Sequence, residues 1–405
     1  MNIFKDLPSP DEMKNLAENA QVTTMKVNGH FHTPYSFSAF DCTEKVLQMA
    51  VDENIDVLGI NDFYTMAGYE EFASLCSSYK KFPLFNIEFM GLLKEEQEKG
   101  IKVNDPANPG RTYLSGKGLD YPVSLKGNSL QRLEGVRRES DLQVREMVQK
   151  TSDYLVSIDP DLAIDFDEIL DQYTRGMVRE RHIAQVIRIR VFEKYNNDAD
   201  RLAILTSIYG GRECKANIQD TASVDGEIRS MLLKSGGPGF VKEDPKAFLD
   251  IPDVIKIIRD AGGIPCYPVL LDDSKGYVTE FERDYEALYN RLTSLNIWSL
   301  ELIPGRNTLS FLISFTRFFK ERGFVITFGT EHNTPVLDPL TVSAGDGELD
   351  EELLSVNFEG AAVIAAHQFL RAHGEQGFIG ADGKPGDIRE YVRLGKTIIQ
   401  QFTGK

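Results

Sequence analysis

The sequence predicts an α/β fold in which strands and helices alternate, interrupted by a mainly helical segment. Between residues 25 and 91, short apolar runs typical of strands alternate with amphipathic segments typical of helices. The alternation returns after residue 251, whereas residues from about 127 to 250 show helical periodicity. Strands that alternate with helices indicate a mostly parallel sheet or an α/β barrel. We therefore expect a barrel that carries a helical insertion.

The first part of the barrel is expected to contain three strands and two helices. Apolar runs predict strands at residues 25–31, 56–60 and 83–89. Helices are expected at residues 43–53, where Thr43 is placed to cap the helix, and at residues 69–79. Residues 92–126 are polar and rich in Gly, Pro and Lys, which predicts a long loop that carries a hairpin.

The insertion and the rest of the barrel follow. In the insertion, residues 166–195 form an amphipathic pattern that breaks near Gly176. A helix at 254–260 is ended by Gly262 and Gly263. Further elements are expected as strands at 264–267, 298–303 and 324–328, and helices at 280–295, 309–322, 360–373 and 387–402. We divide the chain into residues 1–126 (first part of the barrel), 127–250 (helical insertion, a lid), 251–340 (rest of the barrel) and 341–405 (C-terminal extension).

Composition and charge restrict the partners of this 405-residue chain. A net charge of −17 repels the backbone of a nucleic acid duplex, although a bound metal or a few arginines can still attract a small anion locally. The four cysteines are widely spaced, which favours reduced thiols in a cytoplasm over disulfides. We see no stretch of about 20 apolar residues and no signal-peptide core, so we expect no membrane partner. The sequence leaves the oligomeric state open.

Residue types that bind metals recur where strands are predicted to end. His30 and His32 lie at the end of the first strand, and residues two apart in a strand share a face, so both imidazoles can reach one ion. The other strands end in Asp62, in Glu88, and in Glu331 with His332. Because strand ends meet at one rim of a barrel, these side chains predict a metal site there.

Several basic residues could bind an anion near this rim. His182 lies in the insertion within a basic segment that includes Arg179 and Arg181. The segment is either a solvated helix face or a lid that brings His182 and an arginine over an anionic substrate. Lys117 and Arg306 lie in Gly-containing loops on the strand-end side, where either could bind an anion. Surface loops also carry such residues without a specific role.

Together these segments resemble the polymerase-and-histidinol-phosphatase (PHP) superfamily of metal-dependent phosphoesterases. The family's HxHT…S motif is matched by HFHTPYS at residues 30–36, its Thr-Asp-His by NDF at 61–63, and its strand-end glutamate by Glu88. Its Ala-Gly-Gly-Ile-Pro and Ala-His-Pro are matched by AGGIPCYP at 261–268, and its Gly-Ser-Asp-x-His by GTEHN at 329–333. One branch, which hydrolyses small nucleotide-type phosphates, carries Gly-Arg-Pro-His-Ile-Ala-Arg-Ala-Leu where this chain has RERHIAQVI at 179–187; GGPGFV at 236–241 also fits.

The sequence departs from the family at several metal-binding positions. Phe63 and Tyr267 stand where the family usually has histidines, and Thr112 and Tyr113 lie where another often follows the glutamate. Asn333 stands where the last histidine would fall. Such sites commonly hold up to three ions, and a phenylalanine cannot ligate one. We therefore expect one or two divalent ions rather than three.

The resemblance implies a distorted TIM-like (β/α)7 barrel with a mainly helical insertion and a C-terminal helical extension. It implies hydrolysis of a phosphate ester of a small molecule by metal-activated water, with zinc, manganese or iron as the ion. It assigns the metal to His30, His32, Glu88, Glu331 and His332, catalysis to Asp62 and His182, and substrate phosphate to Arg179 or Arg181. Two alternatives stay open. One is a mononuclear hydrolase or isomerase that acts on a sugar-like substrate, and the other is a non-catalytic small-molecule-binding protein.

Overall fold

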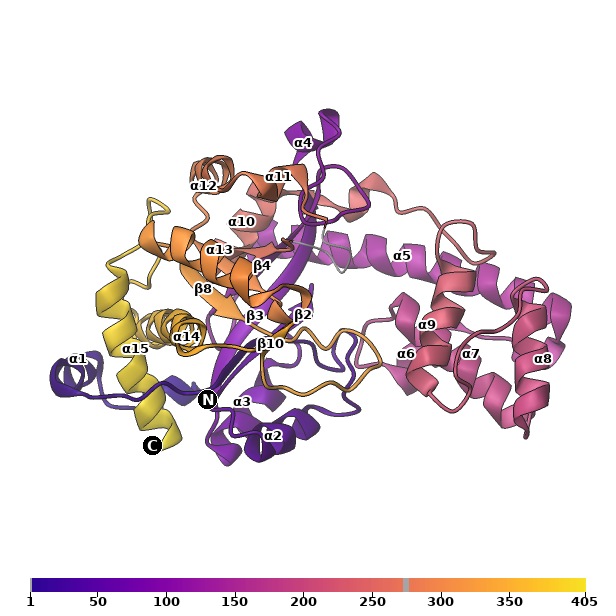
Figure 1. The fold of residues 1–405 in the computed structure, drawn as a ribbon, viewed down its shortest axis with the longest axis horizontal. Helices are drawn as coiled ribbons and strands as arrows, with labels where there is room; N and C mark the ends of the chain where they lie inside the picture. Colours follow the sequence, from indigo (N-terminus) through magenta and orange to yellow (C-terminus); the bar gives the residue numbers. More distant parts are fainter. Residues whose placement is uncertain (1, 272–276) are drawn as a thin grey trace.

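The computed structural model describes residues 2–271 and 277–405, and its central feature is the barrel that the sequence predicts (Figure 1). The strands pair in the order β1 (Val27–Phe31), β2 (Val57–Phe63), β3 (Phe82–Leu92), β4 (Arg111–Lys117), β6 (Ile264–Val269), β7 (Ser299–Leu302) and β8 (Val325–Phe328). Within this order β4 is antiparallel to both neighbours, and the other pairs are parallel. The predicted fold class, a distorted TIM-like barrel, is confirmed.

Backbone hydrogen bonds join the two ends of the sheet and nearly close the barrel. The amides of Thr330 and Glu331 donate to the carbonyl of His30 at 3.0 and 2.9 Å, and the amide of His32 donates to the carbonyl of Glu331 at 2.9 Å. These bonds form just after β8, at the rim where the parallel strands end. They bring the HxH segment and the residues after β8 side by side.

Helices between the strands cover the outside of the barrel. They are α2 (Thr43–Asp52), α3 (Tyr69–Tyr79), α10 (Ile251–Asp260), α11 (Glu280–Arg283), α12 (Tyr285–Ser294) and α13 (Leu309–Glu321). The helix expected at 280–295 is two helices, because Asp284 accepts hydrogen bonds from the amides of Glu286 and Ala287 and so starts α12 as its N-cap. Cys42 is the N-cap of α2, and the expected cap Thr43 is instead its first residue.

The region from 92 to 126 is also more ordered than predicted. It contains a short helix, α4 (Lys94–Glu98), and strand β4. This strand pairs antiparallel with β3, as a hairpin would, but it also pairs with β6 and is therefore an integral barrel strand. The two-residue strand β5 (Leu249–Asp250) pairs in parallel with Gly91 and Leu92, the last two residues of β3.

Helix α14 (Glu351–Ala372) crosses the end of the barrel opposite the rim, and α15 (Ile388–Thr403) packs on it with α1 (Pro10–Asn19) beside α15. The side-chain nitrogen of Asn357 donates to the carbonyl of Val27 at 3.0 Å, and its side-chain oxygen accepts a hydrogen bond from the backbone amide of Phe328 at 2.8 Å. Gln368 similarly bonds to backbone atoms of Pro83 and Phe85 at the start of β3. Side chains of α14 thus pair backbone groups that the sheet leaves open.

By length and composition alone α14 could cross a membrane, which the sequence analysis did not anticipate. However, 83% of its apolar window is buried inside the protein. This burial is typical of a core helix of a soluble protein.

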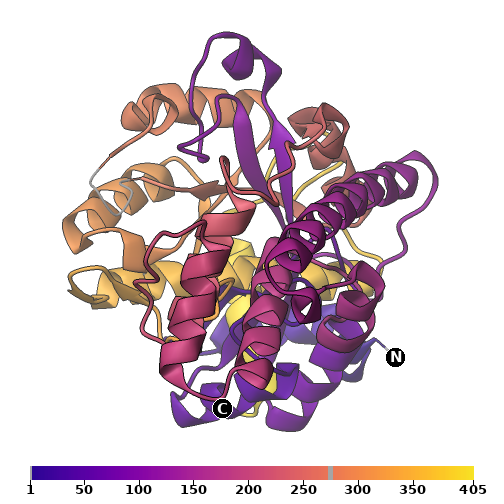
Figure 2. The ribbon, with the colours of Figure 1, turned by 90° about the vertical axis from the view of Figure 1, so that its right-hand side faces the viewer.

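The insertion has a hydrophobic core of its own. It contains α5 (Gly127–Ile158), α6 (Phe166–Tyr173), α7 (Glu180–Lys194), α8 (Asp198–Ile208) and α9 (Thr221–Ile228). Buried side chains from these helices, among them Leu155, Ile187 and Leu205, form a cluster separate from the barrel core. The long helix α5 extends from the barrel into the insertion, and a view from that side shows the insertion helices in front of the barrel (Figure 1, Figure 2). The exact limits of the four segments stay a prediction.

The contact between α14 and the barrel predicts a large difference between two Gly→Ala substitutions in helices. A Cβ on Gly360 would lie 1.9 Å from the carbonyl oxygen of Ile326 in β8, whereas a Cβ on Gly135 in α5 would meet nothing within 4 Å. We expect Gly360→Ala to lower the free energy of unfolding by about 1–3 kcal/mol or more through overpacking. Gly135→Ala should raise it by roughly 0.5–1 kcal/mol through helix propensity.

Urea denaturation of both variants checks this prediction. Equal stabilities for the two variants would show that α14 does not pack on β8 at this distance.

Candidate metal centre

A bulge in β1 turns the two histidines into the barrel. Asn28 pairs with Leu58 and Phe31 pairs with Ile60, so three steps along β1 match two steps along β2. An extra residue of this kind reverses the side-chain alternation and re-aims the side chains that follow. Phe31 consequently packs outside the barrel against the rings of Phe40 and Phe72. His30 and His32 point inward.

Three of the predicted metal ligands meet inside the barrel. One ligand atom from each of His30, His32 and Glu88 lies within 4.8 Å of the other two, and all three side chains are buried. The Nε2 atoms of the two histidines are 3.3 Å apart, and Nε2 of His32 is 3.2 Å from Oε2 of Glu88. The structure therefore brings together His30, His32 and Glu88.

The partners of the other ring nitrogens make this cluster suited to a cation. Nδ1 of His30 is 2.8 Å from the Glu301 carboxylate, and Nδ1 of His32 is 3.1 Å from Oγ of Ser36. Since Ser36 donates its own proton to Asp62 at 2.6 Å, Nδ1 of His32 is the donor of its bond. Both Nδ1 atoms are then protonated, so both Nε2 atoms carry lone pairs, and these atoms lie 3.3 Å apart. The side-chain nitrogen of Asn61 also lies 3.1 Å from Nε2 of His30. A metal ion between the two Nε2 atoms would relieve the repulsion of their lone pairs by forming two ligand bonds.

Glu88 completes the fit. Its Oε2 atom is buried and makes no hydrogen bond, although it lies beside His32. Burial, with the nearby charges of Glu331 and Glu301, raises the pKa of Glu88 to about 8 despite the opposing effect of His30. Burying a carboxylate oxygen without a hydrogen-bond donor is unfavourable, and a bound metal ion would supply the missing partner. These residues fit a divalent ion held by two nitrogens and one carboxylate.

Asp62 has a different role from the expected one. Its two oxygens accept hydrogen bonds from the amide of Thr33 at 2.8 Å, the hydroxyl of Thr33 at 2.5 Å and the hydroxyl of Ser36 at 2.6 Å. Burial raises the pKa of Asp62, while these donors and His32 oppose the rise. Because its oxygens are already engaged, Asp62 holds the turn after β1 and orients His32 through Ser36. The structure does not place it as a free general base.

The two residues predicted after β8 diverge in the structure. Glu331 forms an ion pair with Arg306, and Arg306, His30 and His32 lower the pKa of Glu331 although its burial opposes this. It is thus an ionised carboxylate beside the cluster. His332 instead bonds through Nδ1 to the hydroxyl of Thr330 at 2.7 Å and through Nε2 to the carbonyl of Asp338 at 2.8 Å. With both nitrogens engaged, His332 is not brought into the cluster.

Lys117 lies elsewhere than the sequence predicts. It is the last residue of β4 and pairs with Ile264 at the start of β6. Because β4 is antiparallel, this end of the strand lies opposite the rim, and the expected loop on the strand-end side is wrong. Its ammonium points into the barrel and contacts the carboxylate of Glu301 and Oδ1 of Asn61 at 3.3 Å. The side chain has no exposed surface and does not line the cavity at the insertion, so the structure does not bring Lys117 to the expected substrate position.

Glu301, Asn61 and Ser115 are site residues that the sequence analysis missed. Glu301 bonds to His30, Lys117 and Ser115, and the amide of Asn61 bonds to Ser115 at 3.2 Å. Lys117 and His30 hold the pKa of Glu301 well below its usual range, although burial opposes ionisation. The available signal was a glutamate in the middle of the apolar strand segment 298–303, since a charge is rarely buried in a strand without a partner.

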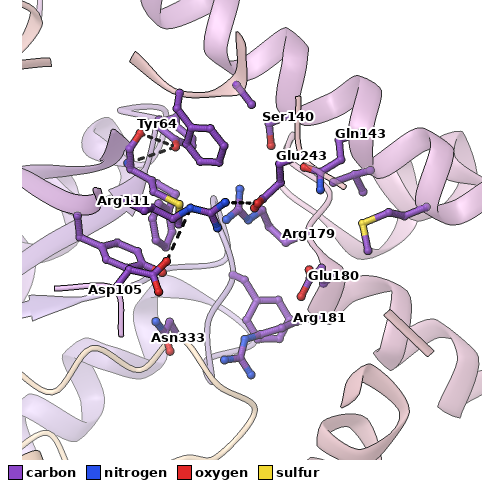
Figure 3. Close-up of a pocket in the computed structure, with 18 of the residues that line it drawn as sticks. Tyr64, Asp105, Arg111, Ser140, Gln143, Arg179, Glu180, Arg181, Glu243 and Asn333 are labelled. Carbon is purple, nitrogen blue, oxygen red and sulfur yellow. Dashed lines mark hydrogen bonds and ion pairs between the residues drawn. The ribbon is translucent and has the colours of Figure 1, made fainter. Parts of the chain in front are cut away.

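A cavity of about 390 Å³ lies next to the cluster, between the barrel rim and the insertion (Figure 3). Most of its charged side chains neutralise one another: Arg111 pairs with Glu243, and Arg229 and Lys234 pair with Glu180. Arg179 and Arg181 have no carboxylate partner in the described part of the chain. Arg181 is mostly buried near Arg229, and this environment lowers its pKa to about 10, so it stays charged at neutral pH.

An aromatic wall separates this cavity from the cluster. Phe63 lines the cavity and stacks on the ring of His32, with ring centres 5.2 Å apart. The guanidinium of Arg179 lies 4.9 Å from the centre of the Phe63 ring, and Tyr113 packs beside Phe63. Phe63 is thus a hydrophobic contact between the histidine pair and Arg179.

His182 does not join the arginines. As the third residue of α7 it turns back, and its Nδ1 accepts a hydrogen bond from the amide of Arg179 at 3.0 Å. Burial, and then Arg179, lower the pKa of His182 to about 3, so it is neutral at physiological pH. It lines a second cavity, of about 580 Å³, between the turn after β1 and the insertion. The structure gives His182 the role of a helix cap.

Comparisons with known proteins show the fold. No family model matches the sequence, and no curated protein matches it significantly. A structure from Bifidobacterium adolescentis, provisionally named a metal-dependent phosphoesterase, is similar with a TM-score of 0.50 and 14% identity, over 84% of this chain and 98% of that one. An amidohydrolase from Chromobacterium violaceum, solved with bound sulfate and no metal, is similar with a TM-score of 0.50 and 16% identity, over 82% and 96% of the two chains.

The geometry of the cluster predicts which histidines retain a metal. We expect His32→Ala to lose the bound divalent ion, because it removes one of three ligands. His332→Ala should keep the ion, because both nitrogens of His332 are engaged elsewhere. Elemental analysis of the two purified variants, with the parent alongside, measures this difference. Loss of metal from both variants would place His332 in the site.

The raised pKa of Glu88 predicts a pH-dependent metal affinity. Below about pH 8 the carboxyl holds a proton in the metal-free protein, and an ion must displace it. We expect the affinity for Zn²⁺ or Mn²⁺ to rise about tenfold per pH unit towards pH 8 and to level off above it. His32 adds nothing in this range, because burial lowers its pKa and leaves it neutral.

Titration calorimetry in two buffers of different ionisation enthalpy would report the released proton. Glu88→Gln serves as the control, since it should bind metal more weakly and without proton release. Proton-free binding to the parent near neutral pH would contradict the assignment of Glu88.

Proposed function

We propose that this chain is a metal-dependent hydrolase that cleaves a phosphate ester of a small molecule, with one divalent ion held by His30, His32 and Glu88. The observation that carries the proposal is the position of these three ligand atoms beside a cavity in which Arg179 and Arg181 lack carboxylate partners. The names of the two similar structures, a metal-dependent phosphoesterase and an amidohydrolase, are compatible with it.

Three protein ligands match the usual construction of a catalytic site, which leaves a coordination position open. When bound, a divalent ion supplies Lewis acidity and lowers the pKa of water to roughly 7. The protein residues orient this centre. Glu301 fixes His30 through Nδ1, and Asp62 fixes His32 through Ser36, so that both Nε2 atoms face the ion position.

Glu331 is the residue best placed to accept a proton in this reaction. It stays ionised because the neighbouring guanidinium of Arg306 lowers the pKa of Glu331. Asp62, the base suggested by the sequence, has its oxygens engaged by Thr33 and Ser36. We therefore assign the proton to Glu331, with Arg306 holding its carboxylate in place.

Arg179 and Arg181 account for the preference for phosphate. Guanidinium groups bind phosphoryl oxygens through paired, charge-assisted hydrogen bonds. These two lie in a partly buried cavity where the remaining cations are already paired with Glu180 and Glu243, so an incoming anion meets a local positive charge despite the net charge of −17. Phe63 and Tyr113 limit the access of bulk water to the cluster.

A substrate panel with matched arginine variants tests the proposal. We expect manganese- or zinc-dependent turnover of p-nitrophenyl phosphate that disappears in His30→Ala. Arg181→Met should lower kcat/KM by about 10- to 100-fold, the equivalent of one charged hydrogen bond. Arg389→Met, which changes a side chain that is 92% exposed at the start of α15, should leave kcat/KM unchanged.

The same panel separates this function from the alternatives. Turnover of an aryl amide or acetate in place of every phosphate ester would replace the phosphoesterase assignment with another hydrolase. Bound metal without turnover of any of these substrates would favour an isomerase or a non-catalytic binding protein.

A further inference from the structure

The ammonium of Lys117 is a fixed positive charge inside the barrel. The side chain has no exposed surface, and Glu301 is 1% exposed. Nζ contacts Oε2 of Glu301 and lies 3.3 Å from Oδ1 of Asn61. The same Glu301 oxygen is 2.8 Å from Nδ1 of His30. The carboxylate of Glu301 therefore links Lys117 to His30, one of the candidate metal ligands.

The atoms around this ammonium are those that a hard metal ion prefers. At the ammonium, Glu301 offers a carboxylate oxygen and Asn61 an amide oxygen. The hydroxyl of Ser115 bonds to the second oxygen of Glu301 and so belongs to the same network. Carboxylate, amide and hydroxyl oxygens are the ligands of Mg²⁺ and Mn²⁺. The position is thus built like a cation site, with a lysine as its cation.

We propose that Lys117 occupies a second cation position of this barrel, and that its ammonium restricts the centre to a single divalent ion. The proposal rests on the proposed function insofar as His30, His32 and Glu88 hold that ion. A buried carboxylate needs a compensating charge, because an unpaired one is costly to desolvate. Lys117 supplies this charge from within the chain, whereas a metal ion would have to be captured. The ammonium also repels any divalent ion that approaches Glu301.

Removal of the lysine should open this position to a metal. After dialysis against Mn²⁺, we expect Lys117→Ala to bind about one more Mn²⁺ ion per chain than the parent does, as measured by elemental analysis. The double variant Lys117→Met, Glu301→Gln removes both charges and should bind the same number as the parent. Lys81→Ala removes another buried lysine, which lies 4.0 Å from Asp56, and should also leave the count unchanged.

The comparison is between variant and parent, so its outcome is separate from that of the proposed function. A parent without metal would end the proposed function, while an extra ion in Lys117→Ala would still support the second cation position. A folded Lys117→Ala chain, judged by circular dichroism, with no more Mn²⁺ than the parent would overturn the inference.

A melting experiment covers the case in which the single variant is unstable. We expect added Mn²⁺ to raise the Tm of Lys117→Ala more than that of the parent or of the double variant, because the ion replaces the missing charge. A Lys117→Ala chain that Mn²⁺ does not stabilise, beside a double variant that folds, would also overturn the inference.

Discussion

The buried charge of Glu301 is the constraint on which the interior of this barrel depends. A carboxylate at 1% exposure persists in ionised form only if its oxygens find donors and a compensating charge. Lys117 provides the compensating positive charge. The hydroxyl of Ser115 donates to one oxygen of Glu301, and His30 and Lys117 both contact the other oxygen. The antiparallel direction of β4 makes this possible, because it lets a long side chain at the far end of the barrel reach towards the metal position.

The carboxylate of Glu301 orients His30, and a second buried carboxylate, that of Asp62, orients His32 through Ser36. With Nδ1 of His30 committed to Glu301 and Nδ1 of His32 committed to Ser36, each ring presents a lone pair on Nε2. The bulge in β1 then decides where these lone pairs point, since a regular strand would turn His30 to the outside with Ile60. Asp62 holds the turn that follows. The geometry of the centre is therefore specified by residues that would never touch substrate.

The sequence predicted the parts of the site that follow from a local pattern. His30, His32 and Glu88 each come directly after an apolar strand run, and strand ends of a barrel must converge. Prediction failed where position depends on strand direction or on a single backbone angle. Lys117 was predicted in a loop on the strand-end side, yet it ends a strand that runs antiparallel to its neighbours, so the residue lies at the opposite end. Glu331 and His332 have positive φ values of 69° and 49°, a turn that sends the two neighbouring side chains apart and that no pattern reveals.

The fold class was predictable because it depends on the alternation of strands and helices along the whole chain. A local error, such as predicting one helix at 280–295 where the structure has two, does not change this alternation. Packing accounts for the two aromatic residues at positions where the resemblance implies histidines. One face of the Phe63 ring stacks on His32, and the guanidinium of Arg179 also packs against this ring. The hydroxyl of Tyr267 donates a hydrogen bond to the buried carboxylate of Glu282 at 2.8 Å. Both positions are closed by structure, with no vacant ligand left behind. Among the described residues, the buried polar atoms without a hydrogen-bond partner include Oε2 of Glu88, a candidate ligand, but no atom of Phe63 or Tyr267. The packing around the cluster therefore leaves Glu88, and neither of these aromatic positions, open to a cation.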